Sequence, residues 1–237
     1  MIELDEVSHR FGERVVLRDV TLDLSERRIG VIGANGSGKS TFARLLNGLV
    51  VPTRGRVLVE GHDTRREGAE VRRRVGFVFT DPDAQIVMPT VAEDVGFSLR
   101  RLRLSSSERD RRVREVLDRF GLADHADQPA HLLSGGQKQL LALAAVLVTE
   151  PTVLVCDEPT TLLDLRNSER VASLLRELPQ QVVLVTHHLD LLEGFDRVLV
   201  VDDGEVVHDA TPESAVQFYR DLSRGLSGGR LGDGGSP

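Results

Sequence analysis

The chain has 237 residues, of which 40% are hydrophobic and 28% charged, and its formal net charge is −7. This composition is ordinary for a globular protein, and the length suits one domain or one domain with an added lobe. The acidic balance argues against a protein that binds nucleic acid through its phosphate backbone. No apolar run approaches the ~20 residues of a membrane span. The acidic N-terminus lacks the basic start and apolar stretch of a signal peptide, so we expect a cytosolic protein.

Short strands are predicted in the N-terminal part. Residues 2–7 and 20–24 alternate apolar and polar side chains, and residues 11–14 are a turn candidate between them. Two further strands are predicted at 56–59 and 75–79.

A buried strand is predicted at 29–32, and it leads into the run Gly33-Ala34-Asn35-Gly36-Ser37-Gly38-Lys39-Ser40. This run fits the phosphate-binding pattern G-x-x-x-x-G-K-[ST], and a helix is predicted to follow over residues 41–46. The glycines allow the backbone to wrap a phosphate with its N–H groups pointing inward, and the helix N-terminus adds further N–H groups.

Polar side chains at the end of this loop extend its chemistry. Lys39 can reach the outer phosphates of a nucleotide, and the Ser40 hydroxyl can ligate Mg²⁺. Thr41 follows at the start of the helix. The alternative is a glycine turn before an ordinary helix, which the combination of strand, loop, Lys-Ser pair and helix disfavours.

The pattern changes to helical spacing in the middle of the chain, where apolar side chains recur as at Val113 and Val116. We therefore predict a helical subdomain over about residues 86–150. It is inserted into an α/β core that we place at about 1–85 and 151–225. A hairpin is expected near the end of this core, around Asp203-Gly204. The Gly- and Ser-rich residues 226–237 are predicted to form a flexible tail.

Two buried strands return after the helical subdomain, at 153–156 and 182–185. Asp157 and Glu158 follow the first of them, at the edge where an open α/β sheet binds its ligands. Asp157 is placed to hold Mg²⁺ and Glu158 to orient or deprotonate water. The alternative for this acidic pair is the start of a helix.

His187 follows the second of these strands, where it is placed to contact the γ-phosphate and the attacking water. The alternative is a capping or core histidine. His188, the next residue, leaves the choice between the two imidazoles open.

A second anion-binding segment is predicted at Leu133-Ser134-Gly135-Gly136-Gln137. Ser134 resembles an N-cap, and the two glycines leave backbone N–H groups open at the start of an apolar helix. One chain has little use for two γ-phosphate sites unless the second serves the nucleotide of another molecule. The alternative is a helix cap with a Gly-Gly turn.

In their order and spacing these motifs resemble those of the ATP-binding-cassette ATPases, over nearly the whole chain. The resemblance implies an α/β fold, with a P-loop NTPase core, an antiparallel β subdomain and an inserted α-helical subdomain. It also implies a head-to-tail dimer in which each ATP and its Mg²⁺ lie between the phosphate loop of one subunit and residues 134–137 of the other. Glu158 and His187 would be catalytic, and Ser40 and Asp157 would hold the metal.

Two further positions follow from the same resemblance. Asp164 matches the loop that crosses between the two nucleotide sites, and Phe11 matches the aromatic residue that stacks on adenine, although Phe11 is equally a candidate for packing in the hairpin. The predicted nucleotide-binding residues are Phe11, Gly33, Ala34, Asn35, Gly36, Ser37, Gly38, Lys39, Ser40, Thr41, Ser134, Gly135, Gly136, Gln137 and Asp164.

Residues 79–85 and 89–95 resemble the ATPases of energy-coupling-factor transporters, which import vitamins and transition-metal ions. Residues 158–167 are most similar to the biotin branch, and the cobalt and nickel ATPases come next. This resemblance implies a peripheral subunit on the cytoplasmic face of the cell membrane. Its partners would be a second ATPase subunit, identical or related, a transmembrane coupling subunit and a substrate-binding membrane subunit, with no nucleic acid. The alternatives are an importer of cobalt, nickel or another vitamin, and a soluble ATPase of the same family.

The sequence departs from the family at two positions. Thr80 stands where the family usually has a glutamine that helps to ligate Mg²⁺ and senses the membrane partner, and Gln85 lies a few residues further on. Thr80 is shorter, so we expect its hydroxyl to act only through a water, if at all. Leu140 stands where an arginine is common, and it is expected to replace a surface ion pair by packing.

Two charged features remain open. Residues 85–97 are expected to form the groove for the membrane partner, and Asp81, Asp83, Glu93 and Asp94 make it acidic, whereas the alternative for the last two is helix-start acidity. Clustered arginines, as in Arg72-Arg73-Arg74 and Arg111-Arg112, are interpreted as solvated helix faces, with a lipid-facing strip as the alternative.

Overall fold

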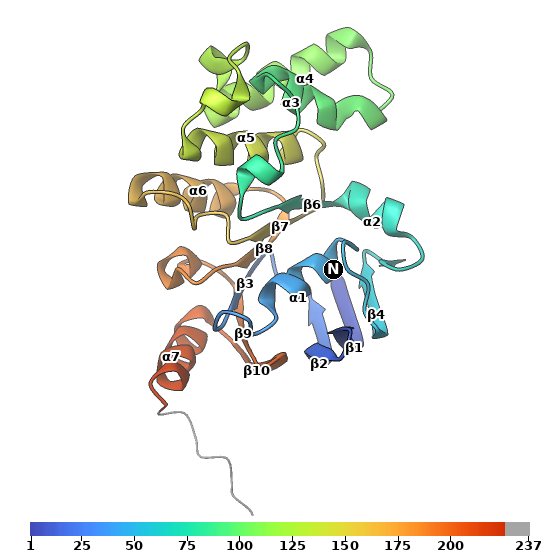
Figure 1. Ribbon diagram of the computed structural model, residues 1–237, viewed down its shortest axis with the longest axis vertical. Helices are drawn as coiled ribbons and strands as arrows, with labels where there is room; N and C mark the ends of the chain where they lie inside the picture. The colour runs from blue at the N-terminus through green and yellow to red at the C-terminus, as the bar shows by residue number, and fades with distance from the viewer. Residues whose placement is uncertain (226–237) are drawn as a thin grey trace, which may run out of the picture.

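The computed structural model describes residues 1–225 as two β-sheets with helices between and around them (Figure 1). The predicted tail at 226–237 lies outside the described residues. The antiparallel sheet has the order β2-β1-β4-β5, with β1 (Ile2–Phe11), β2 (Arg14–Leu24), β4 (Arg54–Val59) and β5 (His62–Asp63). The second sheet has the order β10-β9-β3-β8-β7-β6, with β3 (Arg28–Ile32), β6 (Val75–Val78), β7 (Val153–Asp157), β8 (Gln181–Val185), β9 (Arg197–Asp202) and β10 (Glu205–Ala210).

The second sheet is parallel except at β10, and its parallel strands are buried on both faces. Along β7, Val153 and Val155 pack in the apolar cluster that includes the antiparallel sheet and α1 (Lys39–Leu46). The alternate residues Leu154 and Cys156 pack on the opposite face, in the cluster shared with the α-helices that follow β6 in the chain. This burial raises the pKa of the Cys156 thiol. The uninterrupted aliphatic runs of β7 and β8 are therefore explained by contacts on both faces.

Helices α3 (Val91–Ser98), α4 (Ser106–Phe120) and α5 (Gly135–Leu147) follow β6 and form a layer at one end of the molecule (Figure 1). The predicted helical spacing is confirmed in α4, where Val113 and Val116 are buried. Leu140 of α5 is buried as well, so the packing interpretation of this position is correct. Short 3-10 turns connect the layer, namely η1 (Pro82–Ala84), η2 (Leu99–Arg101), η3 (Ala123–His125) and η4 (Ala130–Leu132). Among residues 1–225, none of the helices combines the length and the apolar character needed to cross a bilayer.

The N-terminal strands are longer than predicted, because bulges interrupt their alternation. The register of β1 against β2 shifts between Leu4 and Val7, and Glu6 has a left-handed φ of 47°. After such a bulge the side chains change face, so the sequence pattern breaks while the strand continues. The strands are joined only by Gly12 and Glu13, since Phe11 pairs with Arg14.

Three helices lie outside the predicted elements, and a short 3-10 turn, η5 (Leu189–Leu192), follows β8. Helix α2 (Gly68–Arg74) buries only Val71 completely, so it gives little apolar periodicity. Helix α7 (Pro212–Ser223) buries Ala215 completely and packs Phe218, Tyr219 and Leu222 on the core at helical spacing, which could have predicted it. Helix α6 (Leu165–Glu177) buries Val171, Ala172 and Leu175, a spacing that could have predicted it.

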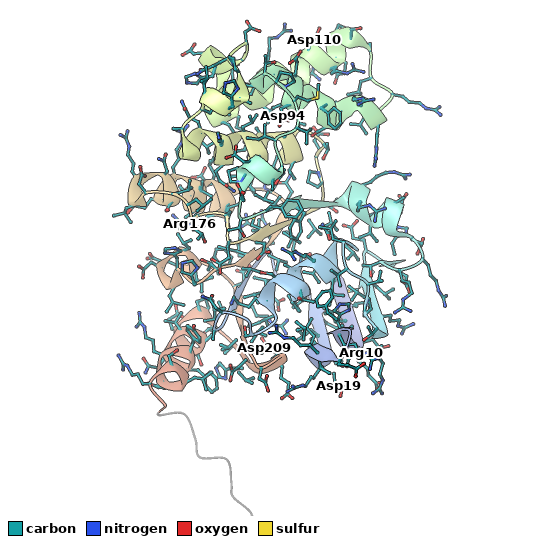
Figure 2. The ribbon with its side chains drawn as sticks, in the orientation of Figure 1. Arg10, Asp19, Asp94, Asp110, Arg176 and Asp209 are labelled. Carbon is teal, nitrogen blue, oxygen red and sulfur yellow. The ribbon has the colours of Figure 1, made fainter. Side chains whose placement is uncertain are left out.

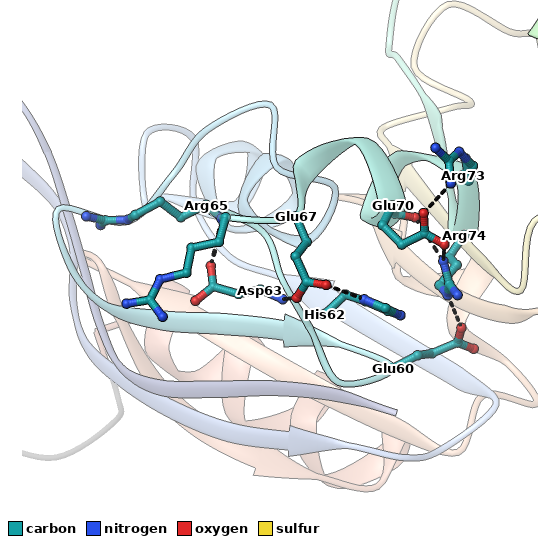
Figure 3. A network of polar contacts seen from close by, with 9 residues as sticks. Glu60, His62, Asp63, Arg65, Glu67, Glu70, Arg73 and Arg74 are labelled. Carbon is teal, nitrogen blue, oxygen red and sulfur yellow. Dashed lines mark hydrogen bonds and ion pairs between the residues drawn. The ribbon is translucent and has the colours of Figure 1, made fainter.

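Four of the five arginines in the clusters at residues 72–74 and 111–112 are paired with acids on helix faces. In α2, Arg73 and Arg74 both contact Glu70, and Arg74 also reaches Glu60 at 3.2 Å (Figure 3). In α4, Arg111 pairs with acidic residues one turn before and after it, at 2.8 and 2.6 Å. Because their charges are already matched, these arginines favour the helix-face interpretation over a lipid-facing strip.

Asp94 is buried in the helical layer, which contradicts its predicted place on an acidic groove. Figure 2 shows it within this layer, whereas Asp110 lies at the outer end of α4. Its Oδ1 accepts hydrogen bonds from the N–H groups of Val87 at 2.8 Å and Met88 at 3.0 Å. Burial raises the pKa of Asp94, and the two N–H donors offset part of this effect.

Glu93, the neighbour of Asp94, closes a capping box with Thr90 at the start of α3. Asp83 pairs with Lys138 of α5 at 2.7 Å. Helix-start acidity and structural pairing therefore account for most of the negative charge in this region.

We expect Asp94→Ala to lower the free energy of unfolding by about 1–3 kcal/mol, because it leaves the partly buried N–H groups of Val87 and Met88 without this acceptor. Urea titration followed by far-UV circular dichroism measures this change. Asp110→Ala is the control, since Asp110 is exposed, and it should change stability by less than ~0.5 kcal/mol. Equal effects of the two substitutions would contradict the structural importance of Asp94.

Candidate functional site

A cleft of about 860 Å³ lies at the C-terminal edge of the parallel strands, within the usual size of a ligand site. It brings together most of the residues predicted from the phosphate-loop half of the site. These are Phe11, Gly33, Ala34, Asn35, Gly36, Gly38, Lys39, Ser40, Thr41, Glu158 and His187. Ser37, of the same loop, is buried and its hydroxyl has no partner among the described residues.

Glycine is required in the loop by its backbone conformation and close contacts. Gly33 has a φ of 151°, and a Cβ there would stand 2.0 Å from the carbonyl oxygen of Val201. Gly38 is the left-handed N-cap of α1, with a φ of 113°, and no side chain caps this helix start. The first N–H groups of α1 are therefore free of side-chain caps, as an anion-binding helix start requires.

Lys39 is buried within the loop. Its Nζ donates to the carbonyl oxygens of Gly33 and Ala34, each at 2.9 Å. Burial lowers the pKa of this ammonium, and the carboxylates of Glu158 and Asp157 offset part of that effect. The positive charge is thus held beside the loop, where phosphate oxygens could replace the two carbonyls as acceptors.

The side-chain oxygens of Ser40 and Asp157 lie next to each other at the end of the loop, where both could ligate a metal ion. The Ser40 Oγ donates to Asp157 Oδ1 at 2.9 Å, and Arg44 stands 3.8 Å from the other carboxylate oxygen. Burial raises the pKa of Asp157, and the Ser40 hydroxyl and Arg44 offset only part of this. A buried carboxylate beside a hydroxyl suits a hard cation such as Mg²⁺, which would favour the ionised form.

Glu158 and His187 lie together in the cleft. Glu158 has a left-handed φ of 55°, and its N–H donates to Val185 O at 2.9 Å. Its Oε2 accepts from His187 Nδ1 at 2.5 Å and from the Thr161 hydroxyl at 3.1 Å. A strained backbone at a cleft residue is common at functional sites, and here it directs the carboxylate toward the histidine.

In the structure, the Thr80 side chain is hydrogen-bonded directly to the backbone. Its hydroxyl donates to the backbone carbonyl of Asp157 at 2.8 Å, although the residue also lines the cleft. Gln85 does not line the cleft, because its side chain accepts from Phe79 N and donates to Ala142 O, at 3.2 and 3.4 Å. Gln85 therefore joins η1 to α5 and does not supply the missing glutamine.

Residues 134–137 and Asp164 are not brought to this cleft. Ser134 is the N-cap of α5 and forms a capping box with Gln137, so the helix-cap interpretation is correct as local structure. The cap leaves Gly135 exposed, and a Cβ there would meet nothing closer than 3.8 Å. Asp164 is the N-cap of α6 and accepts from Asn167 N at 2.8 Å.

The cleft also contains residues that the sequence did not indicate, namely Arg14, Val16, Thr161 and Tyr219. Arg14 could have been predicted, since it pairs with Phe11 across the hairpin. Tyr219 comes from α7, and no local pattern links that helix to the phosphate loop.

Sequence comparison places the chain among transport ATPases. The family model described as "ABC transporter" matches residues 17–161. A provisionally named ABC transporter ATP-binding protein of Deinococcus radiodurans is 58% identical, over 93% of this chain and 98% of that protein. The biotin transport ATP-binding protein BioM of Rhizobium etli is 46% identical, over 94% of this chain and 99% of its own length.

Solved structures share the fold. The protein cbiO1 of Clostridium perfringens, part of the ABC transporter complex cbiONQ, superposes with a TM-score of 0.82 at 31% identity, covering 95% of this chain and 93% of its own. The dimeric, post-hydrolysis ATP-binding cassette MJ0796, bound to ADP and Pi, gives a TM-score of 0.79 at 31% identity, covering 90% and 99%.

Lys39→Ala should lower the affinity for ATP by at least about tenfold, because it removes the charge held at the loop. Isothermal titration calorimetry measures the affinity. Lys138→Ala is the matched control, since Lys138 is the only other lysine and pairs with Asp83 outside the cleft. Unchanged binding by Lys39→Ala would refute the assignment of the loop.

Asp157→Asn should make the nucleotide-free protein more stable at pH 7. The folded-state pKa of Asp157 is raised, so its stabilising contribution is present at low pH and is lost as the pH rises through that pKa. Asparagine avoids this loss and keeps an acceptor for Ser40. We expect the thermal midpoint to rise by about 2–4 °C, which corresponds to ~1 kcal/mol in a chain of this size.

Two observations check the cause of this change. The gain should shrink as the buffer is made more acidic, and the stimulation of ATP binding by Mg²⁺ should be lost in Asp157→Asn. Asp110→Asn, at an exposed site, should show neither effect. A lower midpoint at pH 7 would show that the charge at Asp157 is not a cost to the fold.

Proposed function

The chain belongs to the ABC transporter family, and we propose that it powers an importer of the energy-coupling-factor type whose cargo is biotin. It is an ATPase and the ATP-binding subunit of an ABC transporter. The observation that carries the finer proposal is the end-to-end match to the biotin transport protein of Rhizobium etli, at 46% identity over 94% of this chain. We retain the division into a nucleotide-binding domain at 1–225 with a helical subdomain at about 86–150.

We propose that the site is completed by a second ATPase subunit, a copy of this chain or a related one. One chain supplies the phosphate loop, Glu158 and His187 in a single cleft, with Asp157 bound to Ser40 of that loop, whereas residues 134–137 do not line the cleft. A head-to-tail dimer would place each of those segments over the other subunit's loop. The dimeric state of the cassette bound to ADP and Pi supports this arrangement.

The residues in and beside the cleft would each have a distinct role in ATP hydrolysis. Lys39 and the loop N–H groups would bind the phosphates, and Ser40 and Asp157 would hold Mg²⁺, which supplies charge neutralisation when bound. The Glu158 carboxylate would accept a hydrogen bond, and then the proton, from the attacking water. His187 holds that carboxylate at 2.5 Å and would orient it toward the γ-phosphate.

Release of the γ-phosphate would remove the link between the two subunits, so the dimer would open and move its membrane partners. We propose that these partners, a transmembrane coupling subunit and a substrate-binding subunit, dock over residues 85–97. Val87 and Phe97 are exposed there, at 62% and 38%. Apolar contacts are therefore a better basis for docking than the acidic groove expected from the sequence. On this proposal the subunit lies at the cytoplasmic face of the membrane.

We expect Glu158→Gln to bind ATP but to lower the rate of hydrolysis by at least about 10²-fold, because glutamine cannot accept the proton. In a strain that lacks this chain, the wild-type protein should restore the uptake of labelled biotin and Glu158→Gln should not. Glu193→Gln serves as the control in both assays, because Glu193 is exposed at the end of η5 and does not line the cleft.

The outcomes separate the parts of the proposal. Near-normal turnover by Glu158→Gln would refute its catalytic role. Uptake of cobalt or nickel, but not biotin, that depends on this chain would make the cargo assignment wrong. If no membrane protein co-purifies with the chain from solubilised membranes, the importer proposal fails and a soluble ATPase remains.

A further inference from the structure

One backbone N–H group and three side chains form a continuous line of hydrogen bonds at the start of α5. Gln137 Oε1 accepts from the Ser134 N–H at 2.9 Å, and Gln137 Nε2 stands 2.9 Å from His125 Nε2. His125 Nδ1 stands 2.6 Å from Gln128 Oε1. The line therefore runs from Ser134 through Gln137 and His125 to Gln128. We call residues 134–137 the signature segment.

One backbone N–H sets the direction of every hydrogen bond in this line. The Ser134 N–H can only donate, so the carboxamide of Gln137 must turn its oxygen toward Ser134 and its NH₂ toward His125. His125 Nε2 must then accept, which places the imidazole proton on Nδ1, where it donates to Gln128 Oε1. The line satisfies each of these groups only with neutral His125 in this tautomer.

The far end of the line is anchored by the backbone. The Gln128 N–H donates to His125 O at 2.9 Å, and Gln128 O accepts from Val91 N at 3.2 Å, at the first residue of α3. His125, Gln128 and Gln137 are all half-buried, whereas Ser134 and Gly135 are exposed. The line thus connects a fixed point between α3 and α5 to the exposed signature segment.

We propose that His125 is a positioning residue for the reaction: it fixes the Gln137 carboxamide and, through it, the signature segment that closes the partner subunit's ATP site. This inference rests on the proposed function, in which that segment contacts nucleotide across the dimer. Without His125, the Gln137 carboxamide would lose one of its two orienting partners. The capping box would then sample several conformations, and ATP would have to order it before the dimer could close.

The test uses the full chain carrying Glu158→Gln, in which ATP-dependent dimerisation can be followed without turnover by analytical ultracentrifugation. His125→Phe keeps the ring and removes both nitrogens. We expect it to weaken ATP-dependent dimerisation by about tenfold or more, while ATP binding to the isolated subunit changes by less than about twofold. In the chain with Glu158 intact, ATP hydrolysis should need a higher protein concentration to reach the wild-type rate.

His125→Gln should recover dimerisation to within about threefold of the parent, because its amide oxygen can accept from Gln137 near the position of Nε2. Asp124→Asn, at the exposed neighbouring position, should leave dimerisation unchanged. The thermal midpoint of each variant is recorded, so that a general loss of folding, which would also reduce ATP binding to the isolated subunit, is distinguished from loss of positioning.

Gly135→Asp tests the premise separately. There is room for a side chain at Gly135. The new carboxylate would lie against the phosphates of the ATP bound to the partner subunit, so the substitution should abolish ATP-dependent dimerisation. If it does not, the proposed dimer site fails and the inference on His125 fails with it. If Gly135→Asp abolishes dimerisation while His125→Phe has no effect, or if His125→Gln fails to rescue, only the positioning role of His125 is overturned.

Discussion

The parallel register of β3, β8 and β7 is the constraint on which the candidate site depends. Val31 pairs with Val185, and Val185 pairs with Asp157, so the three strands end at one edge of the sheet. Hydrogen bonds from Glu158 N to Val185 O and from Thr186 N to Val31 O continue this alignment beyond the strands. The phosphate loop and the acidic residues meet here because parallel strands place their carboxyl ends together.

Two helix starts in this chain differ in their capping. Helix α1 begins at Gly38 with no side-chain cap, so its N–H groups are open to an anion in the chain's own cleft. Helix α5 begins at Ser134 with a complete capping box, which a line of side chains ties to the helical layer. Its exposed glycine lies outside the cleft, as expected for a segment that serves another subunit.

Three acidic residues of this chain differ in their burial and in their hydrogen-bond partners. Asp94 is buried and satisfied by two backbone N–H groups, so it stabilises the helical layer. Asp157 is buried with a hydroxyl and a distant arginine for partners, an arrangement that a cation would complete. Glu158 lines the cleft, and its carboxylate contacts His187. Similar carboxylates thus have different functions because the fold gives them different neighbours.

The phosphate loop, the buried parallel strands and the helical layer were predictable from the sequence, because each has a local pattern of spacing or chemistry. The fold class was implied by the family resemblance of the motifs. The prediction missed α2, which buries a single residue, and the length of β1, where a bulge breaks the alternation. It also missed α7, although the apolar residues of that helix recur at helical spacing. The packed fold was needed to show that Asp94 is internal and that Gln85 bonds to α5. It was also needed to show that Tyr219 lines the cleft and that His125 contacts Gln137. Contacts between residues far apart in the chain depend on packing, and no local pattern records them.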